Sequence, residues 1–168
     1  KLHQQTSESV LLALKKQIAQ VDKQIDQAIK TDDGLQTRVD LLTSIPGVGR
    51  QTALYMLIFT ANFTRFDDAK KLASYAGVAP FAYESGTSVR GRTKVSPMAN
   101  KKLKHLLYMA ALGAVRVKGE LKDYFERKVG AGKRKMSVLN AVRNKLVHRI
   151  MAVMERGTAY REVWVKIG

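Results

Sequence analysis

A chain of 168 residues, 45% of them hydrophobic, is long enough to bury a core, and its size predicts one domain with an appendage. Its 30 basic and 14 acidic residues give a net charge of +16, so the expected partner is a polyanion, either nucleic acid or a membrane surface. The absence of cysteine excludes disulfides and thiolate metal sites, and no apolar run approaches the roughly 18 residues that a spanning helix needs.

The start of the chain is polar over residues 1–9 and shows no signal peptide. It begins with Lys1 rather than Met, which predicts a piece of a longer protein. We therefore expect a cytoplasmic protein that does not enter a membrane.

The first predicted element is one long helix within a segment of residues 1–36. Thr6, Ser7 and Ser9 are candidate N-caps, and Asp32-Asp33-Gly34 marks its end. Its apolar residues recur at spacings of 3, 4, 3, 4 and 3, namely Leu11, Leu14, Ile18, Val21, Ile25 and Ala28. This period of about 3.5 residues is typical of a coiled coil. Three arrangements satisfy it: pairing between chains, pairing within one chain, or an amphipathic helix packed on its own domain.

Residues 37–168 are predicted to form one helical domain, which opens with two helices around a tight turn at about 38–61. Pro46 ends the first helix, and Gly47 and Gly49 permit a sharp turn beside the positive N-terminus of the next helix. Backbone N–H groups at such a corner bind phosphate. The pattern is typical of a helix-hairpin-helix element, with Gly47, Gly49 and Arg50 as candidate nucleic-acid contacts. A plain corner between two helices is the alternative.

The rest of the chain predicts further helices interrupted by one ordered segment. Asp67 and Asp68 are candidate caps of a short helix that residues 77–80 close. Residues 81–97 are rich in Ser, Thr and Gly and are predicted to form an ordered loop or a short hairpin. Basic helices follow over residues 100–156, in the segments 100–114, 121–128 and 138–155, with a flexible basic loop at 130–135. The predicted fold class is therefore all-α.

The positive charge is concentrated in one part of the chain. Residues 90–149 hold 17 basic and three acidic side chains, whereas residues 1–89 hold ten and nine. The simplest interpretation of such a run is a solvated, lysine-rich surface. However, so many positive side chains would repel one another without counter-charges, so the excess favours contact with nucleic acid. The candidate contacts are Arg90, Arg92, Lys94, Lys101, Lys102, Lys104, Lys133, Arg134 and Lys135.

Conventional catalytic sets are missing from the sequence. The histidines His3, His105 and His148 are scattered, and no carboxylate cluster suits two-metal phosphoryl transfer. Ser85-Gly86 lies in a loop that continues with Arg90, Arg92 and Lys94, which could hold an anionic phosphate beside the hydroxyl. Serine needs a base to become a nucleophile, and a Ser-Gly pair by itself is usually only a turn.

Three motifs occur in a fixed order along the chain. They are Ile45-Pro46-Gly47-Val48-Gly49 with Thr52-Ala53, then Phe66 with Leu72-Ala73-Ser74-Tyr75-Ala76-Gly77-Val78-Ala79-Pro80, and finally Ser85-Gly86. From about residue 41 to residue 160 this series resembles the C-terminal transposase domain of the insertion-sequence 110 family, which is grouped with the 116 and 902 types and with related site-specific DNA invertases. The preceding coiled-coil helix fits the same family.

The resemblance implies a mechanism that two domains share. Members carry an N-terminal RNase H-like domain whose three Asp and one Glu bind divalent metal, expected to be magnesium. A serine of the C-terminal domain attacks a DNA strand and forms a covalent phosphoserine link. By position that nucleophile would be Ser85, with Ser88 as the competing hydroxyl. The implied partners are DNA, a structured bridge RNA and further copies of the chain in a homodimer or tetramer, at the nucleoid of a bacterial or archaeal cytoplasm.

The sequence departs from the family pattern at two places. Ala99-Asn100 stands where the family often has Gly-Asn, and the acidic metal-binding domain is not part of this sequence. We therefore expect no metal site in this chain and predict that it binds nucleic acid without cutting it. Two other functions stay open. One is a non-catalytic helix-hairpin-helix module for nucleic-acid binding and dimerisation, and the other is an assembly protein with incidental charge.

Overall fold

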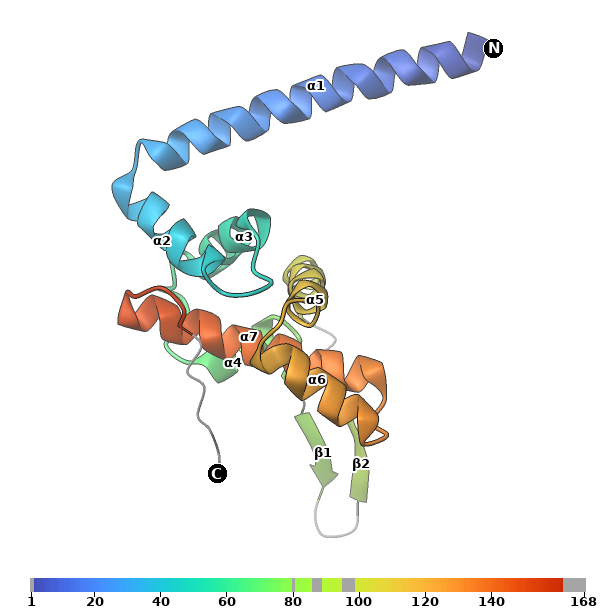
Figure 1. The fold of residues 1–168 in the computed structure, drawn as a ribbon, viewed down its shortest axis with the longest axis vertical. Helices are drawn as coiled ribbons and strands as arrows, with labels where there is room; N and C mark the ends of the chain where they lie inside the picture. The colour runs from blue at the N-terminus through green and yellow to red at the C-terminus, as the bar shows by residue number, and fades with distance from the viewer. Residues whose placement is uncertain (1, 80, 86–88, 95–98, 162–168) are drawn as a thin grey trace. The chain divides into compact units, whose positions relative to one another are not determined.

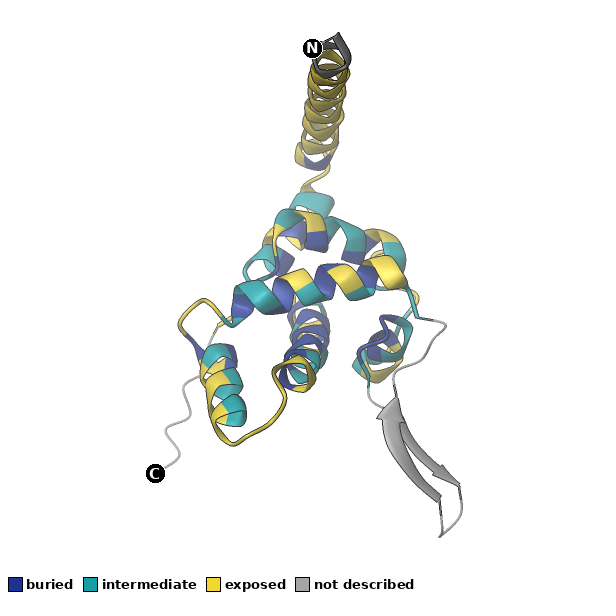
Figure 2. Cartoon of the chain, turned by 90° about the vertical axis from the view of Figure 1, so that its right-hand side faces the viewer, coloured by how far each residue is buried: buried dark blue, intermediate teal, exposed yellow. Residues whose placement is uncertain are grey.

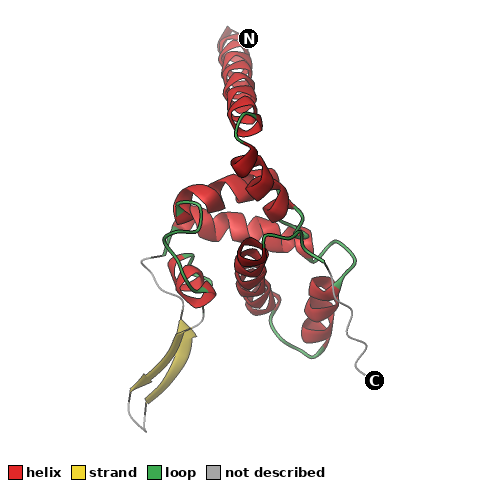
Figure 3. Cartoon of the chain, turned by 90° about the vertical axis from the view of Figure 1, so that its left-hand side faces the viewer, coloured by secondary structure: helices red, strands yellow, loops and turns green. Residues whose placement is uncertain are grey.

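The computed structural model describes the backbone of residues 2–79, 81–85, 89–94 and 99–161, and the side chains of residues 7–79 and 99–161. Within these ranges the chain forms seven α-helices and two short β-strands (Figure 1, Figure 3). In order they are α1 (Leu2–Lys30), α2 (Asp33–Thr43), α3 (Arg50–Thr60), α4 (Ala69–Tyr75), β1 (Phe81–Ser85), β2 (Val89–Lys94), α5 (Lys101–Ala114), α6 (Glu120–Gly130) and α7 (Lys135–Arg156). The predicted all-α class is confirmed. No helix of the described part is both long enough and apolar enough to cross a membrane.

The chain divides into two compact units, residues 1–38 and residues 39–168. The first unit is dominated by α1, which runs without interruption for 29 residues and confirms the predicted long N-terminal helix. Its apolar seam is exposed to solvent, as the yellow colour of this helix in Figure 2 shows. Leu14, Ile18 and Val21 keep 49%, 61% and 52% of their surface accessible. Ile29 is the buried residue of this helix, at a position one residue beyond the predicted Ala28.

The break after α1 is shorter than the sequence predicted. The first helix ends at Lys30, close to the expected stop near Asp32-Asp33-Gly34, but α2 begins at Asp33 and includes Gly34. Asp32 accounts for this early start, since its Oδ1 accepts a hydrogen bond of 2.9 Å from the backbone N–H of Leu35. An aspartate that satisfies a free N–H group in this way starts a helix rather than ending one.

The core of the second unit is built around α7. This helix packs against α4, α5 and α6, and α5 also packs against α3. The dark blue turns of these helices in Figure 2 are buried. The largest fully buried side chains include Leu42, Ile45, Met56, Leu72, Leu103, Leu107, Leu146 and Ile150. Val142, Leu146 and Ile150 lie on one face of α7, and Leu139, Val147 and Met151 are buried beside that face, so a wide part of this helix is covered by its three neighbours.

A left-handed turn follows α3. Ala61, Asn62 and Phe63 have φ values of 48°, 55° and 66°, a conformation that non-glycine residues rarely adopt. Thr60, which is fully buried, holds the turn in place. Its hydroxyl donates to the carbonyl of Met56 at 2.7 Å and accepts the N–H of Phe63 at 3.0 Å. This buried hydroxyl therefore stabilises the turn, together with backbone hydrogen bonds such as the one from the N–H of Asn62 to the carbonyl of Leu57.

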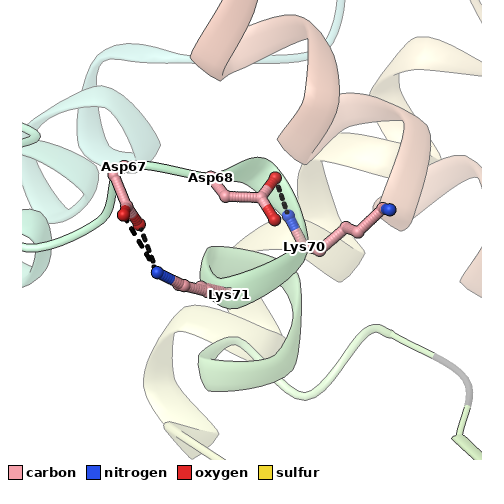
Figure 4. Close-up of polar contacts among 4 residues, drawn as sticks. All are labelled: Asp67, Asp68, Lys70 and Lys71. Carbon is pink, nitrogen blue, oxygen red and sulfur yellow. Dashed lines mark hydrogen bonds and ion pairs between the residues drawn. The ribbon is translucent and has the colours of Figure 1, made fainter.

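The start of α4 follows the sequence prediction. Asp68 is its N-cap, and its carboxylate accepts a hydrogen bond of 3.0 Å from the N–H of Lys70 (Figure 4). Asp67 instead forms an ion pair with Lys71 at 2.8 Å. The hydrogen bond and the charge of Lys71 lower the pKa of Asp67 below its ordinary value. The two aspartates that the sequence proposed as caps thus have separate roles.

The serine-bearing segment forms a β-hairpin, which was one of the two predicted alternatives. Strands β1 and β2 pair antiparallel, with Ser85 opposite Val89 and Glu84 opposite Arg90. The register shifts between Phe81 and Tyr83, which marks an irregularity near the base of the hairpin. Along the chain the hairpin lies between α4 and α5, and it extends away from the helices of the second unit (Figure 1).

Candidate nucleic-acid interface

The turn between α2 and α3 packs closely against α5. Gly47 has a φ of +87°, and a Cβ added to it would lie 2.3 Å from the carbonyl oxygen of Ala110 and 2.8 Å from the Cβ of Ala114. Gly113 lies on the other side of this contact, where an added Cβ would be 3.4 Å from the Cα of Gly47. Both the backbone conformation and the lack of space therefore require glycine at position 47. This packing role was not predicted, and the proposed phosphate contact of Gly47 stays a prediction.

Gly49 has a different environment from Gly47. It is exposed, an added Cβ would meet nothing within 4 Å, and it is the N-cap of α3 without a side-chain hydrogen bond. The start of α3 and the side of α5 enclose a pocket of about 430 Å³ whose lining includes Gly49, Gln51, Lys102 and His105. The positive end of a helix and an ammonium group beside the same pocket favour an anion there. The structure thus brings together three predicted residues, Gly47, Gly49 and Lys102, around one pocket.

The predicted lysines at the start of α5 lie on the surface. Lys101 and Lys102 are exposed, and Lys104 is partly exposed. The Lys102 ammonium lies 5.0 Å from the ring centroid of Tyr55 on α3, so a cation–π contact holds it near the pocket. The described contacts do not join Lys101 or Lys104 to the same pocket.

Asn100 fixes the position at which this basic helix begins. Its Oδ1 accepts the N–H of Leu103 at 2.9 Å, and its Nδ2 donates to the hydroxyl of Tyr75 at 3.0 Å. Its own backbone N–H bonds the carbonyl of Tyr75 at 2.9 Å. The ring of Tyr75 in turn lies 5.3 Å from the guanidinium carbon of Arg65. The start of α5 is therefore capped by Asn100, with Ala99 in place of the family's glycine.

The candidate nucleophile is described through its backbone. Ser85 is the last residue of β1, and its partner Val89 is the first residue of β2. Arg90, Arg92 and Lys94 all belong to β2. The side chains of these four residues, and the whole of Ser88, lie outside the described residues, so their predicted roles stay predictions. The fold does place Ser85, Arg90, Arg92 and Lys94 on the two paired strands of one short hairpin.

A second basic site lies in the connection between α6 and α7. The predicted loop of residues 130–135 is shorter in the structure, because Gly130 ends α6 and Lys135 begins α7. Lys133, Arg134 and Lys135 are all exposed, and the N-cap Arg134 makes no side-chain hydrogen bond to the helix. Two of the three carboxylates of α6 are paired elsewhere: Glu120 with Lys145 and Arg149, and Glu126 with Lys122.

Sequence reasoning missed a buried arginine in the middle of α7. Only 9% of Arg143 is exposed, and its Nε has no hydrogen-bond partner. Its guanidinium lies 5.6 Å from the ring centroid of Tyr108 on α5, and burial lowers the pKa of Arg143 below its ordinary value. The sequence held a signal for it. Arg143 follows Leu139 by four residues, which puts a charge on the apolar face of a helix.

The described residues include no group of three or more His, Cys, Asp or Glu side chains that could hold a metal ion. Of the two histidines whose side chains are described, His105 and His148, neither belongs to such a group, and His105 instead lines the pocket beside α3. The divalent metal that the family resemblance implies therefore finds no fitting set of ligands in the described part of this chain.

The comparisons with known proteins identify the family. The profile described as "Transposase IS116/IS110/IS902 family" matches residues 39–126, more than half of the chain. The chain belongs to this family. The matched region starts with the second compact unit and includes the glycine turn, the hairpin and the basic helix α5. The resemblance that three motifs indicated is thereby confirmed.

Several curated proteins are similar to the chain. The pilin gene-inverting protein of Moraxella lacunata is 31% identical over 144 residues, which are 85% of this chain and 45% of that protein. A 43.6 kDa protein of insertion element IS110 from Streptomyces coelicolor is 32% identical over 120 residues, 71% of this chain and 29% of that protein. A 44.8 kDa protein of insertion element IS116 from Streptomyces clavuligerus is 33% identical over 122 residues, with coverages of 73% and 29%. The chain spans less than half the length of these relatives.

Proposed function

We propose that this chain is the DNA-binding, serine-bearing part of an insertion-sequence transposase or site-specific recombinase. The observation that carries the proposal is the family membership, together with the name of a relative that inverts a pilin gene. The charge supports it independently, because the net excess of residues 90–149 suits the phosphate backbone of a nucleic acid. A structured RNA is a second expected ligand of the same cationic surface.

In the proposed reaction, Ser85 attacks a DNA phosphodiester. A bond forms between the serine Oγ and phosphorus, and the bond from phosphorus to one deoxyribose oxygen breaks, which leaves a phosphoserine link and a free sugar hydroxyl. The serine proton passes to a base, and the departing oxygen takes up a proton. We assign that base to the metal-binding domain that the family resemblance implies. Arg90, Arg92 and Lys94 would stabilise the negative charge that develops on the phosphate.

The test is a covalent adduct between DNA and a protein that also contains the metal-binding domain. A radiolabelled recombination site is incubated with this longer protein and run on a denaturing gel. The unchanged protein is expected to retain label on the protein band, Ser85→Ala to lose it, and Ser88→Ala to keep it. The 168-residue chain alone is expected to bind the DNA and form no adduct. An adduct that survives Ser85→Ala refutes the nucleophile, whereas tight DNA binding with no adduct in the longer protein supports the non-catalytic binding module.

We also propose that α1 pairs with the α1 helix of a second copy. The seam of this helix is exposed along most of its length, including 55% of Leu11 and 38% of Ile25, so its apolar surface is available to a second helix. Burying such a seam in a two-stranded coil is the usual way to stabilise a helix with this period. Sedimentation equilibrium tests the proposal. Ile18→Asp is expected to shift a dimer to monomer, and Leu12→Asp, an exposed position off the seam, is expected to leave the dimer intact.

A further inference from the structure

The pocket between the start of α3 and the side of α5 is deeper than a phosphate contact needs. Its volume of about 430 Å³ lies in the range of sites that hold small organic ligands, and a lone phosphate group would fill only part of it. It has a buried floor, formed by Thr52, Leu106 and Ala110, and an exposed rim that includes Lys102 and Met109. A ligand can therefore enter from solvent and bury one of its sides.

Three side chains of the pocket lining are available for hydrogen bonds. No hydrogen bond between described residues uses the hydroxyl of Thr52, the amide of Gln51 or the imidazole of His105. Thr52 is the most informative of them, because only 6% of it is exposed and a buried hydroxyl normally has a partner. The backbone N–H groups of Gln51 and Thr52 also precede the first backbone hydrogen bond of α3, which runs from Ala53 to Gly49. The pocket therefore presents donors and acceptors to a ligand.

The α5 side of the pocket is apolar. Leu106, Met109 and Ala110 line it, and Met109 keeps 52% of its surface exposed. The thioether of methionine is polarisable and makes favourable contacts with aromatic rings. An apolar wall beside hydrogen-bonding groups suits a base that has left its strand, because the base faces lie against the wall and its edge carries donors and acceptors. In a duplex the bases are paired and stacked, so an unpaired base is the part of a nucleic acid that fits this wall.

The charge at the rim suits the phosphate that accompanies such a base. Lys102 is held beside the pocket by its cation–π contact with Tyr55 at 5.0 Å. Gly49, the N-cap of α3, makes no side-chain hydrogen bond, so the positive end of this helix also faces the rim. The described lining residues include no carboxylate. A ligand with one aromatic part and one negative part therefore matches both halves of the pocket.

We propose that this pocket binds one unpaired nucleotide of a nucleic-acid strand. Its base lies against Leu106 and Met109, with its edge toward the hydroxyl of Thr52, and its phosphate lies at Lys102 and the start of α3. The inference rests on the proposed function in taking a nucleic acid as the partner, and it adds that the strand is unpaired at this point. Both DNA and RNA carry this chemistry, and the experiment tests each.

The first test compares two end-labelled 20-base-pair duplexes, one fully paired and one with a single 2-aminopurine bulged from one strand. The unchanged 168-residue chain is expected to bind the bulged duplex roughly tenfold more tightly, because the pocket buries apolar surface of the base. The 2-aminopurine fluorescence is expected to rise as the base leaves the stack of its neighbours. The comparison is made with DNA and with RNA, and a preference for the bulge in either supports the proposal. Equal affinities for paired and bulged duplexes in both would overturn it and leave a simple phosphate contact.

The second test asks whether the pocket is responsible for that preference. Met109→Ala is expected to abolish the preference for the bulge, because it removes the apolar wall. Thr52→Val keeps the shape of the side chain and is expected to reduce the preference about fivefold through loss of one hydrogen bond. The matched control is Met136→Ala, which removes a methionine of similar exposure, 57%, at the start of α7 and should keep the full preference. Because Met109 is half exposed, its truncation tests the pocket even if the change at buried Thr52 alters folding. A full preference in Met109→Ala would refute the pocket.

The third test concerns the phosphate half of the site. Lys102→Met is expected to reduce the slope of log affinity against log salt for the bulged duplex by about 0.9, because one phosphate contact is lost. Lys71→Met removes the same charge from an exposed residue already paired with Asp67, and its slope should stay unchanged. An unchanged slope in Lys102→Met would overturn the phosphate contact.

The outcomes separate this inference from the proposed function. If the unchanged chain binds neither duplex, the nucleic-acid function fails, and the nucleotide pocket fails with it. If the chain binds both duplexes with equal affinity, the nucleic-acid function stands and only the nucleotide pocket is refuted.

Discussion

The two compact units of this chain use the same kind of amphipathic helix in opposite ways. In α1 the apolar seam stays exposed, with 61% of Ile18 accessible, whereas in α7 the equivalent face is closed and Leu146 and Ile150 are fully buried. Both faces repeat at helical spacing, so periodicity alone does not distinguish them. The difference comes from the neighbours, because α7 packs against three helices of its own unit.

This comparison shows that an apolar seam in the sequence predicts that the seam will be buried, but not which helix will bury it. The second unit satisfies its seams internally and can be stabilised or damaged by changes within one chain. The apolar seam of α1 contributes little to stability until another helix covers it. Substitutions of similar size should therefore have very different effects in the two units, and the following predictions use that contrast.

The largest effect is expected from truncating the core of the second unit. Leu146→Ala should lower the free energy of unfolding by about 2–5 kcal/mol, because it removes buried methyl groups and leaves a cavity. Urea denaturation followed by circular dichroism measures it. The matched change Leu14→Ala in α1, where 49% of the side chain is exposed, should cost less than about 0.5 kcal/mol in dilute protein. Equal losses at both positions would show that α1 is packed and would break the comparison.

A second, slightly smaller effect is expected from the glycine turn. Gly47→Ala should cost about 2–4 kcal/mol, since it combines a positive φ of 87° with a Cβ only 2.3 Å from the carbonyl oxygen of Ala110. Gly49→Ala should be nearly neutral, because its φ is −84° and an added Cβ meets nothing. The same urea titration compares the two variants. A tolerated Gly47→Ala would refute the close packing of the turn on α5.

The sequence predicted the elements whose causes are local. Asp68 caps α4 as proposed, because a capping aspartate acts on the N–H groups of its own turn. The basic helix at 101–114 and the long first helix were likewise predicted from their own residues. The first helix ends at Lys30, near the predicted stop at residues 32–34, but the start of α2 at Asp33 was not predicted, because the glycine signal concealed the capping role of Asp32.

The features that the sequence did not predict depend on distant residues. Gly47 was assigned to phosphate binding, but its tight fit depends on Ala110 and Ala114, more than sixty positions away. Burial of Arg143 depends on helix packing and on Tyr108, so composition alone counted it among the surface charges. The assignment of Ser85 rests on the family resemblance, because a Ser-Gly pair has no distinguishing local chemistry.

A smaller effect is expected at the helix start that follows the hairpin. Asn100→Ala should cost about 1–2 kcal/mol, because it removes the cap of α5 and the bond to the Tyr75 hydroxyl together. Asn100→Asp keeps the oxygen that caps Leu103 and loses only the donor to Tyr75, so it should cost less than the alanine variant. Thermal unfolding ranks the two. Equal losses in both variants would mean that the contact to Tyr75, rather than the cap, stabilises this junction.

The smallest effect is expected from the surface pair of Asp67 and Lys71, whose side chains are 76% and 63% exposed. The pKa of Asp67 is lowered from 3.8 by the hydrogen bond and the charge of Lys71, so its contribution to stability is present above pH 3.8 and is lost as the pH falls through the lower folded-state pKa. A carbon-detected NMR titration of the Asp67 carboxyl measures the shift directly. In Lys71→Met the midpoint should rise toward 3.8, and an identical midpoint in both proteins would show that no ion pair forms in solution.

The stability of the second unit should barely change between pH 5 and pH 4, because a solvent-screened pair contributes little beside a closed core. Lys71→Met therefore tests the effect of a surface charge alone, because it leaves unchanged the core packing that distinguishes the second unit from α1.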